Sequence, residues 1–367
     1  MKYKSYIGLL AIAAMVTSCS QDVVEDSVFK GDEVFATLPE LVDGNVKTRS
    51  ALIYNSSDKK MHFTWEEGDK IGVFAINNDA GRRQQVRFNL VKGEGTLAGG
   101  FEASDESMKN IEKDKQYIAF RPYSKEDDYA KLDLKYNAQV ASAFPKMKYF
   151  PFSGNTGKDV EKYNKSEKAA SAHLTNADYM VSSPTTALED RHCSFEFKRI
   201  GAVVRFYMKS PNNIVYDGIQ LVAKGNKKFI LTGTLEAETK EITPVTTDNA
   251  IFLTFSPTLD LTDENSDYYY NGAGYIVSYM MIAPIDLSDA EDISIYLKGH
   301  DRAGNSHYYK SKGELKKPNL TANMFYQWTS ADNSDDAAII FDKITVQDWE
   351  KDVKYSNGEE GTGTSIW

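Results

Sequence analysis

Two pairs of side chains in this sequence have residue types that could support catalysis or bind a metal. His192 and Cys193 are adjacent, which would suit a nucleophilic pair, but neighbouring side chains on a strand point to opposite faces. His300 and His307 flank the turn-like stretch DRAGNS, yet two histidines are one or two ligands short of a zinc site. We therefore expect Cys193 to be a buried, unreactive thiol and the two histidines to be surface residues.

Two further stretches resemble binding motifs without completing either. Asp263, Asn265 and Asp267 alternate as in the start of a calcium loop, but the glycine at the sixth position and the closing glutamate are missing. The stretch KGEGTLAGG (92–100) has the glycines of a phosphate loop without the Lys-Ser/Thr or the helix that should follow. We predict a polar loop and a turn, respectively. No Ser-His-Asp arrangement stands out, so we predict no enzyme, no cofactor and no metal site.

The composition is that of an acidic, globular protein with a sizeable core. The 367 residues are 41% hydrophobic and 12% aromatic, and the numerous Tyr and Phe residues favour β-structure. The formal net charge is −10, whereas binding to nucleic-acid phosphates requires clustered Lys and Arg. We therefore exclude nucleic acid as a partner.

The first residues have the pattern of an export signal. Two lysines precede an apolar run at 7–16, which is too short to span a bilayer as a helix. The run ends in Val-Thr-Ser-Cys, a small-residue site that resembles a bacterial lipobox. We predict a signal peptide over 1–18, lipid attachment at Cys19 and a flexible acidic tether over 19–33; an ordinary signal peptide with a chance cysteine is the alternative. With Cys19 acylated, Cys193 has no partner for a disulfide.

Beyond this leader the hydrophobic period is two, which predicts an all-β fold. The alternating runs are short and are bounded by clusters of Gly, Asn, Asp or Lys, as in β-sandwiches. They span 34–38, 71–76, 86–90, 117–123, 195–198, 200–208, 214–222, 228–235, 251–255, 275–282, 293–298 and 306–310. We predict an N-terminal sandwich over 34–188, with a lysine-rich surface loop at 153–172, and a C-terminal sandwich over 189–367.

A candidate strand lies near each end of this body. Residues 34–38 precede Arg49, and residues 339–349 (IIFDKITVQDW) follow an acidic break at 332–336. An extended terminal segment can add to an open sheet edge of another molecule, where backbone hydrogen bonds supply affinity and alternate side chains fill pockets. These segments therefore point to assembly rather than to catalysis.

Five segments of the chain are together similar to the fimbrillin family, the type V pilin subunits of Gram-negative anaerobes. They are TRSALIYNSSDKKMHFTWEEGDKIGVF (48–74), QYIAFRPY (116–123), FEFKRIGAVVRFYM (195–208), FILTGTLE (229–236) and LTANMFYQWT (320–329). The resemblance implies two tandem transthyretin-like β-sandwich domains and export as a lipoprotein to the outer membrane and cell surface. It also implies assembly into a fimbrium that mediates adhesion.

The same resemblance implies assembly by strand exchange that a protease triggers. In this scheme an arginine-specific protease removes the first strand of the N-terminal domain, and a terminal strand of another subunit fills the groove. Carried over to this chain, the cut falls between Arg49 and Ser50, residues 34–49 are the cleaved segment, and 337–367 is the donor segment. The donor-strand candidates are Ile340, Ile344, Val346 and Trp349.

The residues themselves leave alternatives open. Arg49 also suits an ordinary polar turn, and residues 339–349 could form the last internal strand of the second sandwich, since Asp342 and Asp348 share a face with apolar residues. Our leading hypothesis is a non-enzymatic pilus subunit whose partners are other pilin subunits. The alternative is a non-polymerising surface lipoprotein that binds glycans or a host or bacterial ligand, with the tyrosines at 268–270 as candidate contacts.

Overall fold

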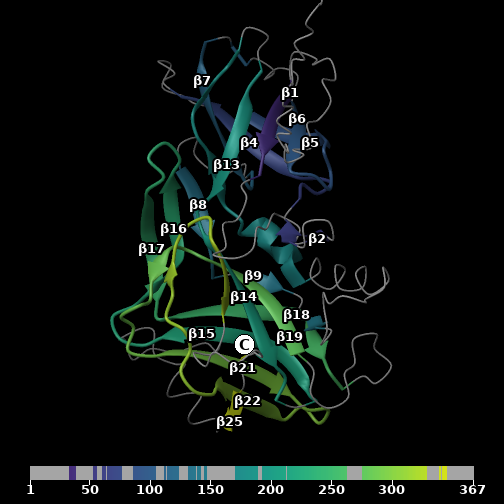
Figure 1. The fold of residues 1–367 in the computed structure, drawn as a ribbon, viewed down its shortest axis with the longest axis vertical. Helices are drawn as coiled ribbons and strands as arrows, with labels where there is room; N and C mark the ends of the chain where they lie inside the picture. The colour runs from purple at the N-terminus through teal and green to yellow at the C-terminus, as the bar shows by residue number, and fades with distance from the viewer. Residues whose placement is uncertain are drawn as a thin grey trace, which may run out of the picture. The chain divides into compact units, whose positions relative to one another are not determined.

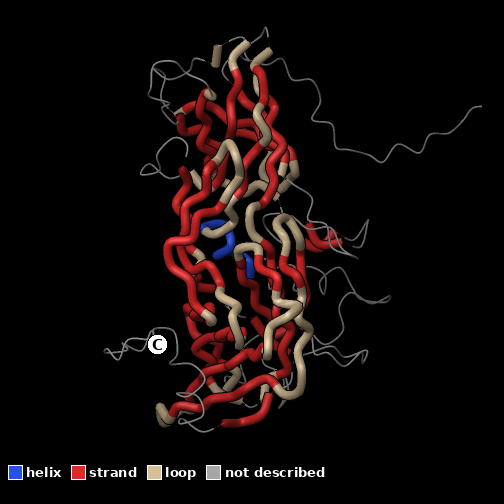
Figure 2. Tube along the Cα trace, turned by 90° about the vertical axis from the view of Figure 1, so that its left-hand side faces the viewer, coloured by secondary structure: helices blue, strands red, loops and turns tan. Residues whose placement is uncertain are grey.

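The structure is a computed structural model, and it confirms the all-β prediction. Apart from the short 3-10 helix η2 (Ala172–Asn176), strands dominate the part of the chain that it describes (Figure 2). No helix within that part is long and apolar enough to cross a membrane. The described residues are 33–38, 53–55, 60–62, 64–76, 86–104, 111–112, 114–123, 131–137, 139–141, 144–146, 170–188, 192–211, 213–262, 275–328, 339 and 341–344.

Seven strands close into a barrel, which Figure 1 shows at the top. The pairing runs β11-β13-β1-β6-β5-β4-β7, and β7 pairs with β11 again, so this ring has no free edge. The strands are β1 (Glu33–Thr37), β4 (Lys70–Ala75), β5 (Val86–Lys92), β6 (Ala98–Ala103), β7 (Gln116–Arg121), β11 (Met180–Ser182) and β13 (Ser194–Arg199), and β12 (Thr185–Thr186) adds to β7. Periodicity predicted sandwiches here, because inward and outward residues alternate in a barrel as they do in a sandwich.

The remaining strands form further sheets. One has the order β10-β19-β14-β24 and another has the order β25-β22-β21-β15-β18-β9, while the small ones are β17-β16-β8, β2-β3 and β20-β23. Their bounds are β2 (Ile53–Asn55), β3 (Lys60–His62), β8 (Lys131–Lys135), β9 (Gln139–Ala141), β10 (Phe144–Lys146), β14 (Ala202–Lys209), β15 (Val215–Ala223), β16 (Phe229–Glu236), β17 (Ile242–Asp248), β18 (Ala250–Asp260), β19 (Tyr275–Ile282), β20 (Ile285–Asp286), β21 (Ile293–His300), β22 (Ser306–Ser311), β23 (Asn319–Leu320), β24 (Phe325–Trp328) and β25 (Phe341–Ile344).

Strand pairing crosses the predicted boundary at 188/189 in both directions. β8, β9 and β10 precede this boundary but pair with β16, β18 and β19, whereas β13 follows it and pairs with β1 and β11 in the barrel. In β8 the alternate apolar residues Leu132 and Leu134 are buried, and in β13 the alternate apolar residues Phe195 and Phe197 are buried. Alternation predicts that a strand has a buried face, but it does not specify which core that face joins.

The described residues form two main hydrophobic cores, and some barrel strands belong to both. The barrel core contains Ile71 and Val73 of β4, while Phe74 of the same strand packs in the larger core of the other sheets. β7 and β11 divide their residues in the same way. The buried residues of β1, by contrast, belong to the barrel core.

Candidate functional site

Several of the predicted site residues lie outside the described part of the chain. This applies to the lipidation site Cys19, to Arg49 and Ser50, and to Ile340, Val346 and Trp349, as well as to the aspartate-rich stretch 263–267 and the tyrosines at 268–270. Among the donor-strand candidates, Ile344 ends β25. The structure therefore bears on the groove that strand exchange would use and on the start of the C-terminal segment.

The candidate catalytic and metal-binding residues do not assemble into a site. Cys193 is buried, as predicted, and burial raises the pKa of its thiol to about 12, which favours the protonated form. His300 contacts Asp217 at 2.8 Å, and His307 contacts Asp301 at 3.3 Å. No group of three or more His, Cys, Asp or Glu side chains in the described ranges could hold a metal ion. The stretch 92–100 forms a turn leading into β6, as predicted.

β1 is the candidate leaving strand, and it is hydrogen-bonded on both sides. It pairs antiparallel with β6 and parallel with β13. Two further backbone bonds hold it, since the Phe35 N–H donates to the Cys193 carbonyl at 2.9 Å and the Leu38 N–H donates to the Leu97 carbonyl at 3.1 Å. β1 is therefore an internal strand of the ring, although it comes first along the barrel sequence.

The two faces of β1 differ in burial. Val34, Ala36 and Leu38 point into the barrel core, and each is at most 2% exposed. On the outer face Phe35 is half-buried and Thr37 is exposed. Burying a Val or Leu side chain stabilises a fold by about 1.5–3 kcal/mol each, so the inward face supplies most of what holds β1 beyond its backbone bonds.

Trp65 contacts the middle of β1 from the loop before β4. Its indole Nε1–H donates to the Ala36 carbonyl at 3.1 Å, and its own backbone N–H donates to Thr96 at 2.9 Å. The indole ring packs edge-on against Phe101, with ring centroids 4.8 Å apart, and against Phe197 at 6.1 Å. A side chain from one loop thus meets both the backbone of β1 and the core beneath it.

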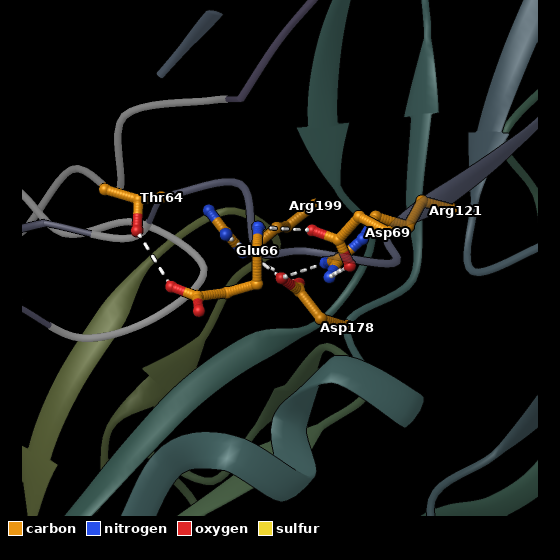
Figure 3. Close-up of polar contacts among 6 residues, drawn as sticks. All are labelled: Thr64, Glu66, Asp69, Arg121, Asp178 and Arg199. Atoms are coloured by element: carbon orange, nitrogen blue, oxygen red, sulfur yellow. Dashed lines mark hydrogen bonds and ion pairs between the residues drawn. The ribbon is translucent and has the colours of Figure 1, made fainter. Parts of the chain in front are cut away.

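Four buried charged residues, which we call the aspartate–arginine network, contact one another (Figure 3). They are Asp69, Arg121, Asp178 and Arg199. Arg121 donates to Asp69 at 2.8 Å and to Asp178 at 3.5 Å, and Arg199 binds Asp178 through two nitrogens at 2.7 and 3.0 Å. The Arg121 guanidinium carbon lies 5.5 Å from the centroid of the Trp65 ring. Two carboxylates and two guanidinium groups balance each other, which is the condition for burying charge.

Burial lowers the pKa of the Arg199 guanidinium, and the Asp178 carboxylate opposes that shift.

Sequence reasoning did not identify this network. A signal was present, because Arg121 and Arg199 occupy positions where the alternation of β7 and β13 calls for inward apolar residues, in phase with Ala119 and with Phe197. An arginine at such a position needs a buried partner.

The C-terminal segment begins differently from β1. Ile339 is fully buried in the larger core and forms a bridge to β14, accepting from the Lys209 N–H and donating to the Tyr207 carbonyl, both at 2.8 Å. β25 then pairs with β22 at the edge of its sheet. In the described part of the chain β25 is thus bonded along one side, whereas β1 is bonded along both.

Comparison with known proteins gives one family match. The model of the fimbrillin-like family matches residues 55–349. No curated protein matches the sequence. A solved structure, of a putative cell adhesion protein from Bacteroides ovatus, is similar at 13% identity and a TM-score of 0.47, covering 87% of this chain and 97% of that one.

Two more solved structures are similar. A fimbrial protein from Bacteroides vulgatus has 11% identity and a TM-score of 0.32, covering 85% of this chain and 98% of that one. The fimbrial anchor protein Mfa2 from Porphyromonas gingivalis has 9% identity and a TM-score of 0.28, covering 75% of this chain and 79% of that one.

Proposed function

Because the chain belongs to the fimbrillin-like family, a family of structural, non-enzymatic fimbrial proteins, we propose that it is an adhesive pilus subunit that polymerises by strand exchange at the β1 position. In this proposal the precursor is a lipoprotein anchored to the outer membrane through Cys19. An arginine-specific protease cuts between Arg49 and Ser50 and releases the segment that contains β1. The mature subunit then joins a fimbrium at the cell surface. In this proposal the subunit contains the two transthyretin-like domains that the resemblance implies.

The observation that carries the proposal is the position of β1 between β6 and β13. β1 is the first strand of the ring along the chain, its inward side chains belong to the barrel core, and its outer face is partly exposed. Arg49 follows it in the sequence. Cleavage after β1 therefore separates this strand from the rest of the ring with a single break in the chain.

Loss of β1 would leave a slot that strongly favours refilling. The facing backbone groups of β6 and β13 would lose their partners, and buried or half-buried backbone groups without partners are costly. The slot would also expose the apolar floor that Val34, Ala36 and Leu38 now cover. An extended segment from another molecule restores both kinds of contact, and exposed strand edges associate in this way.

The proposed donor is the C-terminal segment 337–367, with Ile340, Ile344, Val346 and Trp349 as the residues that enter another subunit. The support is that β25 pairs at the edge of its sheet, so this strand can detach without breaking hydrogen bonds to a strand on its other side. Ile339, which is buried, would remain as the anchor at which the donor segment leaves its own subunit.

An arginine-specific digestion of residues 20–367 tests the proposal. This chain has Cys193 as its sole thiol, and the thiol lies in the barrel core beside β1. We expect a cut at Arg49, release of the β1 segment and reactivity of Cys193 towards a thiol reagent. An Arg49→Lys chain, which lacks this cleavage site, is the matched control.

Two outcomes would overturn the proposal. The first is resistance of Arg49 to the protease, and the second is a cut chain that stays monomeric while Cys193 stays protected. Either result would favour the non-polymerising lipoprotein that binds a glycan or another surface ligand.

A further inference from the structure

We propose that the slot now filled by β1 selects a strand whose middle inward residue is Ala, Gly or Ser, and that this strand comes from a different protein rather than from the C-terminal segment of a second copy. The inference rests on the proposed strand exchange and specifies its partner. The selecting residues are Trp65 and Gly99.

The inward side chains of β1 follow a large–small–large order. Val34 pairs across the strands with Phe101, and Ala36 pairs with Gly99 on β6 and with Phe195 on β13. Leu38 follows at the end of the slot. Residues directly opposite each other on paired strands share a face, so Ala36 and Gly99 both point into the barrel at the same level.

The space at that level is already filled. A Cβ atom added to Gly99 would lie 2.7 Å from Leu90 Cδ1, 2.8 Å from Phe101 Cε2 and 2.9 Å from Trp65 Cδ1. Real Cβ atoms do not approach heavy atoms so closely, so Trp65 and its neighbours occupy the volume that a larger residue would need. Ala36 lies directly opposite Gly99 and is fully buried, and the Trp65 Nε1–H reaches its carbonyl. A leucine-sized residue at this position would therefore have to displace the indole ring or the side chains beside it.

The indole ring is held in place from several sides. The backbone of Trp65 is bonded in both directions to the turn at 93–96, through Thr96 and Gly95. Its ring packs against Phe101 and Phe197, and Arg121 of the aspartate–arginine network lies over it. None of these contacts comes from β1. The space that these residues leave at the position of Ala36, which we call the pocket, should therefore keep its shape when the slot is empty. It can then discriminate between incoming strands.

The same ring fixes the register of the occupant. The Trp65 Nε1–H donates to the Ala36 carbonyl, and because the acceptor is a backbone group, an inserted strand can offer the same acceptor whatever its side chain. A shift of an inserted strand by one residue turns its apolar side chains outward, and a shift by two residues moves a different inward residue under the indole. The slot therefore accepts a strand only if the residue at this one position fits a pocket of fixed size.

The C-terminal segment of this chain lacks the required order. Every Ala, Gly or Ser in 337–367 has a charged or small residue two positions before or after it. Among the donor-strand candidates, Ile340 and Ile344 flank Asp342, which would place a carboxylate under Trp65. Ile344 and Val346 are followed at the same spacing by Asp348, which would bury a carboxylate in the place of Leu38. Burying an unpaired carboxylate is strongly unfavourable.

A strand from another protein therefore fits the slot better than the C-terminal segment of a second copy does. The strand that fits has an apolar residue, a small residue and a leucine-sized residue at alternate positions, and the proposed occupant is a chain of another sequence that carries this order. The C-terminal segment 337–367 would then serve a subunit with a different slot, and the fibre would contain more than one kind of chain.

Peptide binding to the cut chain tests this inference. The chain 20–367 is cut at Arg49 and freed of its β1 segment, and four fluorescent peptides are titrated: residues 31–40, the same peptide with Ala36→Leu, the same peptide with Thr37→Leu, and residues 337–350. Overpacking costs about 1–3 kcal/mol, which corresponds to a loss of affinity of about fivefold to 150-fold. We expect such a loss for Ala36→Leu and for 337–350, and a change below about threefold for Thr37→Leu, whose side chain points outward.

The outcomes separate this inference from the proposed function. Equal binding of 337–350 and 31–40 would overturn the different-partner claim, and equal binding of the Ala36→Leu peptide would overturn the role of the pocket. No binding of the 31–40 peptide would overturn strand exchange itself, and this inference with it.

A second measurement uses the uncut chain: Ala36→Leu should lower the melting temperature, Thr37→Leu should not, and Trp65→Phe should partly restore the Ala36→Leu chain by making room.

Discussion

β1 and β7 are strands of the same ring, but they are held in different ways. β7 is buried on both faces, because Ile118 and Phe120 pack in the larger core while Ala119 packs in the barrel. β1 is buried on its inward face, and Thr37 on its outer face is exposed. Removing β7 would open two cores, whereas removing β1 would open one. A closed barrel can therefore contain both a strand that could be exchanged and a strand that must stay.

The buried charged residues likewise belong with β7 rather than with β1. Arg121 ends β7 and anchors the aspartate–arginine network, while β1 contributes none of the four members. β1 meets that network indirectly, through the ring of Trp65. The buried charges thus stabilise the part of the barrel that should persist after cleavage.

The largest single-residue effect should come from breaking this network. Asp178→Ala leaves Arg199 and Arg121 buried without their shared carboxylate, and removal of one partner from a buried ion pair costs about 3–5 kcal/mol. We expect that loss in the free energy of unfolding measured with urea. The control is Asp289→Ala, which removes an exposed partner of Lys227 and should cost at most about 1 kcal/mol. Equal effects of the two variants would mean that the network does not stabilise the barrel.

A pair of cavity-forming variants tests the contrast between β7 and β1 directly. Ile118→Ala and Leu38→Ala each remove a buried side chain, and such changes cost about 2–5 kcal/mol. The two variants should differ in which strands show faster amide hydrogen exchange. We expect Ile118→Ala to lower amide protection in β14 and β19 as well as in the barrel, and Leu38→Ala to lower it in the barrel strands. Faster exchange in β14 and β19 of the Leu38→Ala chain would show that β1 is as deeply coupled as β7.

Much of this contrast could not have been predicted from the sequence. The positions of β1, β4, β19 and other strands followed from alternation, as did the burial of Cys193. The closure of the ring did not, because it depends on β11, a strand of three residues that is too short to show a period. Nor does alternation indicate which of two cores receives a buried face.

The aspartate–arginine network illustrates the same limit. Arg121 and Arg199 interrupt apolar alternation, which indicates a buried charge, but Asp69 and Asp178 lie 52 and 57 residues away from Arg121. Sequence spacing gives no reason to pair residues so far apart. Trp65 was part of a family-like motif, yet its hydrogen bond to the Ala36 carbonyl depends on a tertiary contact over 29 residues.

Acid should weaken the larger core through His173, which lies in η2 beside the buried Leu174. Burial lowers the pKa of His173 to about 4, against an ordinary value of 6.5, although the backbone groups of Tyr279 and Ala170 oppose the shift. Between these pH values the unfolded chain binds a proton that the folded chain does not. Stability is therefore fully present above pH 6.5 and falls as the pH drops towards 4, by up to roughly 3 kcal/mol.

Urea unfolding of the wild-type and His173→Leu chains between pH 7 and pH 4 isolates this contribution. The wild-type chain should lose more stability over this range than the variant, since other titrating groups are common to both. Thr37→Ala, on the outer face of β1, is the control and should keep the wild-type slope. Parallel curves for wild type and His173→Leu would contradict the assignment.

The smallest expected effect concerns the outer face of β1. Lys92 on β5 places its ammonium 5.0 Å from the centroid of the Phe35 ring, and its side chain also lies against Gly100, the cross-strand partner of Phe35. An exposed cation–π contact contributes about 0.5–1 kcal/mol, so Lys92→Ala should lower the free energy of unfolding by no more than this. After cleavage at Arg49, the same variant should release the β1 segment only about two- to fivefold faster, as followed by Cys193 labelling, because the inward residues dominate its retention. A release rate changed as much as in the Leu38→Ala chain would mean that β1 is held by its exposed face, and the contrast with β7 would then fail.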